Sequence, residues 1–217
     1  MTDRAHSCRF CEIVRNAERR SAVDEPWMAN AQYMAISSVG ALVPGWTLIV
    51  PLAHRLNLAA SVKEDAFLEF AHVVVGTIEA VYGACAIFEH GSIEESSPTS
   101  CGTAHAHIHV VPMSSSLESL SREFDKVRTW EACGLMNLES ASAGKEYLYA
   151  ADRFAGIDTL GSLSVLSEGT SQFFRKVIAS HQGRPEQFDY RAYPQLETAL
   201  ATTKVLSRSV NSISQAA

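Results

Sequence analysis

Three histidines alternate with apolar residues in the segment 105–112, His-Ala-His-Ile-His-Val-Val-Pro. Alternation with a period of two is typical of a β-strand with one buried face, so His105, His107 and His109 are expected to project to the same side. Neighbouring imidazoles then lie about 6.6 Å apart along the strand. Imidazole is a nucleophile, a proton carrier and a metal ligand near neutral pH. Surface strands usually carry Thr, Lys or Glu, so three histidines indicate a functional site.

A second group of reactive side chains lies near the start of the chain, where Cys8 and Cys11 form a Cys-x-x-Cys pair. Such a pair can be half of a zinc site, a redox couple or two unrelated cysteines. A redox pair belongs at the start of a helix that follows a buried strand, and no strand is expected before Cys8. We therefore favour zinc, which needs two further ligands for a closed tetrahedral shell.

The composition is that of a packed protein. Of 217 residues, 47% are hydrophobic and 19% are charged, enough for one substantial domain or a small domain with an extension. The net charge of −6 and the lack of Lys or Arg runs argue against nucleic acid or a membrane as partner. Residues 1–20 lack the apolar segment of a signal peptide, and no stretch reaches the ~20 apolar residues of a membrane span. Five cysteines, an odd number, then favour reduced thiols and a cytoplasmic location.

The elements around these residues follow from periodicity and from helix and turn signals. A short charged helix is expected after the cysteine pair, and two antiparallel strands follow it. Ser61 and Glu64 form a capping box that should open an amphipathic helix, and Gly83 should end this helix. The helix is expected to cover one side of the sheet and to leave the other for a ligand. The expected ranges are a helix over 12–20, strands over 32–37 and 46–50, the helix over 61–83, and a strand over 84–89.

The histidine segment resembles the His-φ-His-φ-His-φ-φ pattern, with φ apolar, of the histidine triad superfamily of nucleotide hydrolases and transferases. Nucleoside phosphoramidases, dinucleoside polyphosphate hydrolases and galactose-phosphate uridylyltransferases belong to it. By the order of its features, the resemblance covers residues 8–112. It implies an α+β fold, with helices packed on one face of an antiparallel sheet. The implied organisation is a catalytic domain over residues 1–113 and a C-terminal α/β extension over residues 114–217.

The resemblance also assigns roles to two of the histidines. In the superfamily the middle histidine attacks phosphorus, a role that passes to His107 here. A neutral imidazole suits this role because it attacks without first losing a proton. The product would be a phosphoryl- or nucleotidyl-His107 intermediate. His109 would then donate to a non-bridging oxygen and balance the developing charge.

A polar loop returns the chain to the histidine strand and should lie beside it. Gly102 lets backbone N–H groups approach an anion, and Ser100 and Thr103 add hydroxyl donors, so all three are expected to contact the substrate. His90 stands where many members of the superfamily have Asn, and is expected to contact the phosphate or the leaving group. Compact members hold the ribose with an acidic residue where this chain has Ser38, which can still hydrogen-bond a sugar. The substrate is therefore expected to be a nucleotide-like or sugar-phosphate-like small molecule.

The resemblance completes the metal site as well. The uridylyltransferases place structural zinc on a Cys-x-x-Cys pair, a ligand after the middle strand and the first histidine of the active strand. In this chain those positions are Cys8, Cys11, His54 and His105. Four protein ligands close the coordination shell, so such a zinc would fix the N-terminus to the sheet and activate no water. His90 is the substitute ligand if one assignment fails.

The last hundred or so residues are expected to pack on the first unit. The segment 170–176 could place the N-terminus of a helix near an anion. A capped amphipathic helix with solvated basic residues is the interpretation we favour there. The expected elements are a helix over 116–132, strands over 146–151 and 163–167, and helices over 171–180 and 195–210.

Together these features predict a hydrolase that acts on a phosphoric anhydride, ester or phosphoramidate through His107. The alternatives are a nucleotidyltransferase or phosphorylase that uses the same intermediate, and a non-catalytic nucleotide-binding protein. An intact nucleophile argues against pure binding, which needs none. The resemblance also implies a homodimer, for which no hydrophobic stripe in the sequence gives support.

Overall fold

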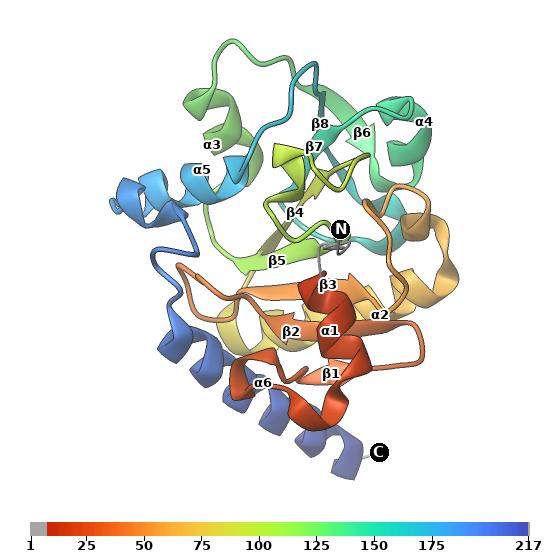
Figure 1. Cartoon of the computed structure of the whole chain (residues 1–217), viewed down its shortest axis with the longest axis vertical. Coiled ribbons are helices and arrows are strands. Elements are labelled where there is room, and N and C mark those ends of the chain that lie inside the picture. Colours follow the sequence, from red (N-terminus) through yellow and green to blue (C-terminus); the bar gives the residue numbers. More distant parts are fainter. Residues whose placement is uncertain (1–7, 217) are drawn as a thin grey trace, which may run out of the picture.

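The computed structural model describes residues 8–216, and the strands of this part lie in one antiparallel sheet (Figure 1). The order across the sheet is β1-β2-β3-β5-β4-β7-β8-β6, and each neighbouring pair is antiparallel. The predicted α+β class with an antiparallel sheet is confirmed. The strands are β1 (Met28–Ala29), β2 (Tyr33–Ser37), β3 (Thr47–Pro51), β4 (Cys85–Gly91), β5 (Ile108–Pro112), β6 (Glu131–Gly134), β7 (Tyr147–Ala151) and β8 (Leu160–Val165).

Helices pack on both faces of the sheet, not on the one face that was predicted, and bury two hydrophobic cores. One core joins α2, α4 and α6 to the face of β5 that carries Ile108 and Val110. The other joins α1, α3 and α5 to the face that carries Val111. The face opposite α2 is thus only partly open to a ligand. The helices are α1 (Arg9–Arg15), α2 (Asp65–Tyr82), α3 (Leu117–Phe124), α4 (Leu138–Ser142), α5 (Phe173–His181) and α6 (Leu196–Ala216).

The histidine strand β5 lies in the middle of the sheet, but it is shorter than the predicted strand over 105–112. It begins at Ile108, so His109 is the one triad histidine within it. Just before the strand, the backbone N–H of Ala106 donates to the carbonyl of Arg55 at 2.6 Å. Ala106 is thus bonded to the segment after β3 and lies outside the strand ladder of β5, so His105 and His107 need not point to the same side.

Three predicted helices differ from the observed ones. The helix predicted over 12–20 corresponds to α1, which begins at Arg9 and ends at Arg15. Helix α2 begins after Glu64, and Ser61 is buried in a preceding 3₁₀ turn, where its Oγ accepts a hydrogen bond from Arg55. The capping-box prediction was therefore wrong. The helix predicted over 116–132 is confined to α3, because Asp125 at its end accepts the backbone N–H groups of Val127 and Arg128 in the following loop. The end of that range forms β6, which pairs with β8.

The C-terminal part continues the sheet instead of forming a second one. Strand β7 pairs with β4, and β8 and β6 follow it outward. Helix α6 returns to the first strands, where Thr202 Oγ1 accepts the backbone N–H of Gly45 at 3.0 Å and Thr203 Oγ1 lies 2.8 Å from Ser37 Oγ. The division into domains over 1–113 and 114–217 stays a prediction. Among residues 8–216, no helix has the combination of length and apolar character that crossing a membrane requires.

Candidate functional site

The three histidines divide between two sites, with Phe10 of α1 between them. The Phe10 ring centroid lies 5.6 Å from that of His105 and 5.5 Å from that of His107. His107 and His109 line one cavity of about 40 Å³, with their ring centroids 4.8 Å apart. His105 turns toward the N-terminal cysteines. Of the three rings expected on one face, only two therefore share a cavity.

The surroundings of His107 fix which of its nitrogens can react. Its Nδ1 lies 2.8 Å from the carbonyl oxygen of His105. A carbonyl only accepts, so in the neutral ring Nδ1 carries the proton and Nε2 carries the lone pair. Burial lowers the pKa of His107 to about 4, which keeps the ring neutral near pH 7. His107 thus has a nucleophilic Nε2.

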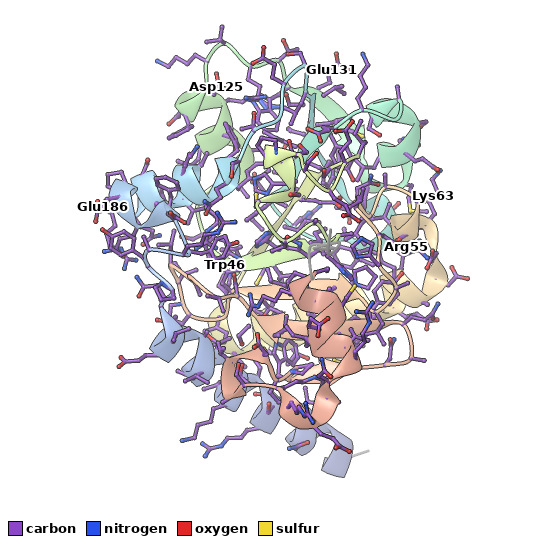
Figure 2. All side chains as sticks on the ribbon, in the orientation of Figure 1. Trp46, Arg55, Lys63, Asp125, Glu131 and Glu186 are labelled. Carbon is purple, nitrogen blue, oxygen red and sulfur yellow. The ribbon has the colours of Figure 1, made fainter. Side chains whose placement is uncertain are left out.

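His109 has the opposite tautomer. The indole N–H of Trp46, a side chain labelled in Figure 2, donates to His109 Nδ1 at 2.9 Å. Indole only donates, so Nδ1 accepts and Nε2 of His109 carries the proton. Register places His109 opposite Leu48 and Phe88, and the Phe88 ring stacks on it at 4.1 Å. Burial holds the pKa of His109 well below its usual value, so this ring is a neutral N–H donor beside the His107 lone pair.

Replacing Trp46 with phenylalanine should remove the hydrogen bond that fixes the tautomer of His109. Without the indole N–H, Nδ1 of His109 has no fixed donor, so its two neutral tautomers should both be populated. Nitrogen-15 chemical shifts of labelled histidine measure this directly. Trp27→Phe is the matched control, because Trp27 is equally buried and its indole N–H has no hydrogen-bond partner among the described residues. A protonated Nδ1 on His109 in the unmodified protein would contradict the assignment.

His90 also lines this cavity, and its predicted contact with the phosphate or the leaving group stays a prediction. Its Nε2 accepts the backbone N–H of Phe174 at 3.4 Å, and its ring centroid is 6.3 Å from that of His109. Burial lowers the pKa of His90 to about 3. His90 is therefore a neutral side chain that joins β4 to α5.

The predicted substrate-binding residues of the loop and of the first hairpin are only partly brought together. Thr103 and Ser38 line the cavity, whereas Ser100 and Gly102 belong to the loop that borders it. The hydroxyls of Ser100 and Thr103 donate to carbonyls within the loop, and Ser38 Oγ donates to the carbonyl of Val39. Gly102 has φ +77°, the left-handed region in which glycine is favoured. Their contacts with a substrate stay predictions.

Sequence reasoning missed several residues that line the cavity. Arg175 from α5 and Tyr190 from the segment before α6 are among them, as are Arg9 and Cys101. The segment 170–176 was the one available signal, since it was considered as an anion site. The favoured interpretation of that segment, a helix with solvated basic residues, was wrong for Arg175, which is only 4% exposed.

The second site brings together the four predicted metal ligands. Their ligand atoms all lie within 4.8 Å of one another. Cys8 Sγ is 3.2 Å from His105 Nδ1, and Cys11 Sγ is 3.3 Å from His54 Nδ1. Ligand atoms of a tetrahedral site with bonds of about 2.0–2.3 Å lie roughly 3.3–3.8 Å apart, so the spacing fits a metal ion.

The elements around this cluster orient its ligands. Cys8 caps α1 by accepting the backbone N–H of Cys11, which places both thiols at the start of that helix. His105 Nε2 lies 2.8 Å from the carbonyl oxygen of Pro51, so Nε2 donates and the lone pair of Nδ1 faces the thiols. His54 follows β3 on the surface. These four residues could hold a metal ion without further protein ligands.

Comparison with known protein families identifies the family of this chain. The family described as "protein similar to CwfJ C-terminal" matches residues 1–125, more than half of the sequence. The chain belongs to this family. The part that matches the CwfJ C-terminal family extends beyond α3, so it includes the cysteine pair and the histidine segment. Arg175 and Tyr190 lie outside that match.

Solved structures similar to this CwfJ C-terminal family member cover half of it. A Hit-like protein involved in cell-cycle regulation from Bartonella henselae, solved with an unknown ligand, has 18% identity and a TM-score of 0.39, covering 49% of this chain and 79% of its own. A hypothetical histidine triad nucleotide-binding protein from Sulfolobus tokodaii has 25% identity and a TM-score of 0.37, covering 49% and 68%. No curated protein matches the chain.

Proposed function

We propose that this protein is a hydrolase that cleaves a phosphoric anhydride, ester or phosphoramidate of a nucleotide-like substrate through His107. The observation that carries the proposal is the pair of opposite tautomers in one cavity. His107 Nε2 has a free lone pair for phosphorus, and His109 Nε2–H is a donor for a phosphoryl oxygen. Histidine nucleophiles and fixed donors aimed at developing charge are the two needs of such a reaction.

The reaction proceeds in two displacements at phosphorus. The lone pair of His107 Nε2 forms the P–N bond, while the bond to the leaving group breaks and its electrons leave with that group, which takes a proton from solvent. The phosphorylated imidazole is then cationic, because Nδ1 keeps its proton. The His105 carbonyl oxygen, 2.8 Å from that nitrogen, stabilises the positive charge. Water then attacks phosphorus and releases a proton, and the P–N electrons return to Nε2.

The shape of the cavity supports a phosphoryl group as the part of the substrate that enters it. A volume of about 40 Å³ has room for a few water-sized groups, whereas whole drug-sized ligands occupy roughly 300 Å³ or more. The nucleoside or sugar half of the substrate is therefore proposed to lie outward, past Ser38. No carboxylate is among the residues that line the cavity in the described part of the chain, which suits an anionic group.

We further propose that the ion held by Cys8, Cys11, His54 and His105 is a structural zinc. Two thiolates and two imidazoles are a common zinc donor set, and four protein ligands leave no position for a reactive water. When bound, the ion supplies folding energy and holds α1 against the histidine segment. His105 belongs to both sites, because its ring supplies one of the four clustered ligand atoms and its carbonyl orients His107. The homodimer and the cytoplasmic location stay predictions.

The function is tested by incubating the purified protein with a nucleoside phosphoramidate, a dinucleoside polyphosphate and a nucleotide sugar. Release of a nucleoside monophosphate from at least one of them is the expected result. A second incubation of the nucleoside phosphoramidate or the nucleotide sugar with added inorganic phosphate identifies the acceptor, since a nucleoside diphosphate that forms only when phosphate is present would indicate a phosphorylase. Binding of AMP without turnover of any of the three would favour the non-catalytic alternative.

A further inference from the structure

Arg175 is a buried cation at the wall of the histidine cavity. It lies in α5 and is only 4% exposed. Its Nε–H donates to the carbonyl of Phe188 at 2.9 Å, and its Nη2 donates to the carbonyl of Gly40. Both partners are neutral main-chain groups, so they fix the guanidinium in place without neutralising it.

Two aromatic rings and a glycine form the rest of the surroundings of the Arg175 guanidinium. Arg175 Cζ lies 4.9 Å from the ring centroid of Trp46 and 5.7 Å from that of Tyr190. Cation–π contacts of this length favour a guanidinium. A Cβ on Gly40 would lie 2.5 Å from Arg175 Nη2, so the glycine leaves the space that the group needs. The guanidinium is therefore pre-organised by two separate segments of the chain, 40–46 and 188–190.

The charge of Arg175 lacks a paired anion. Among the residues that the structure describes, no carboxylate forms an ion pair with it. Burial lowers its pKa to about 10, and the nearby Cys101, Tyr190 and Asp189 act in the opposite direction. Arg175 thus stays protonated at neutral pH. Burying an unpaired cation costs free energy, which a bound anion would offset.

This charge lies beside the reacting histidines, because Arg175 lines the same cavity as His107 and His109. Two of the five guanidinium N–H groups donate to the carbonyls already named, which leaves three for a ligand. Arg9 also lines the cavity, but it is paired with Asp24 at 2.5 Å.

We propose that Arg175 binds the phosphoryl oxygens of the substrate and so selects for a substrate with an anionic phosphate at the cavity. This inference rests on the proposed function, since it adds the anion-binding group to the same site. A guanidinium presents N–H groups in a planar fork that matches two phosphate oxygens. Because α5 lies outside residues 1–125, the C-terminal part of the chain contributes this subsite.

The test measures the binding of inorganic phosphate and of AMP by isothermal titration calorimetry. Arg175→Met should weaken both roughly 10- to 100-fold, because it removes a charge-assisted hydrogen bond. Arg175→Lys keeps the charge without the fork and should fall between Met and the unmodified protein. Arg128→Met is the control, because Arg128 stacks on Phe173 of α5 but is not among the residues that line the cavity. Unchanged affinity in a folded Arg175→Met protein would overturn the proposal.

A second measurement uses the unmodified protein, so its result does not depend on whether a variant folds. In the unmodified protein, phosphate should shift the Nε–H nuclear magnetic resonance of Arg175 and leave that of Arg128 in place. An unmoved Arg175 resonance at saturating phosphate would equally overturn the proposal. The proposed function and the Arg175 subsite can be contradicted separately. Phosphate binding through Arg175 without turnover would contradict only the hydrolase function. Turnover that is unchanged in the Arg175→Met protein would contradict only the proposed subsite.

Discussion

Replacing His107 with alanine is expected to lower kcat/KM by about 10⁴-fold or more, because removal of a covalent nucleophile leaves only binding and charge stabilisation. The Nε2 lone pair is set by the hydrogen bond from Nδ1–H to the His105 carbonyl, and no other described imidazole at the cavity has the same arrangement. Steady-state rates on whichever of the three substrates the protein hydrolyses measure the loss.

The control for this variant is His72→Ala, since His72 is exposed on α2 and belongs to neither site. Its rate should equal that of the unmodified protein. A His107→Gly variant adds a sharper reading, because free imidazole can enter the space of the missing ring and should restore part of the rate. Activity of His107→Ala above a tenth of the original would contradict the assignment of the nucleophile.

Replacing Cys8 with serine is expected to remove the bound zinc and to lower the thermal midpoint by roughly 10 °C. Structural zinc contributes its binding energy to folding, and for a chain of this size about 1 kcal/mol corresponds to roughly 2–4 °C. Cys8 also caps α1, so its loss should loosen Phe10 between the two sites. Activity should fall as well, since the backbone carbonyl of His105 orients His107.

Metal content measured by inductively coupled plasma mass spectrometry decides this prediction, with one zinc per chain expected in the unmodified protein. Cys133→Ser is the matched control, because Cys133 is buried and lies outside the four-residue cluster. It should keep its zinc whatever its stability. Equal zinc in the Cys8→Ser protein would show that the cluster holds no ion.

Much of the sheet was accessible from sequence because local patterns determine it. The strands predicted over 32–37, 46–50, 84–89 and 146–151 agree with β2, β3, β4 and β7 within two residues at each end. Of the four ligand positions predicted by resemblance, His54 and His105 come together because the end of β3 and the start of β5 are neighbours in the sheet. Here sequence order and strand pairing agree, so a pattern of residues becomes a spatial cluster.

Other features depend on contacts between distant segments, which local patterns do not encode. Ser61 has a favourable capping sequence, but Arg55 occupies its hydroxyl and the helix begins later. The local sequence around Arg175 is typical of an amphipathic helix with solvated basic residues. Its burial follows from Gly40 and Phe188, two distant residues whose carbonyls accept its N–H groups. The opposite tautomers of His107 and His109 likewise follow from partners that spacing alone cannot name.

The covalent intermediate is the central claim, and it can be measured directly. The protein is mixed with substrate, quenched in base to protect the acid-labile P–N bond, digested and analysed by mass spectrometry. The peptide that contains residues 105–112 should gain the mass of a phosphoryl or nucleotidyl group on His107, and the His107→Ala protein should gain none. Turnover by the unmodified protein with no such adduct, or with the added mass on another residue, would contradict the mechanism.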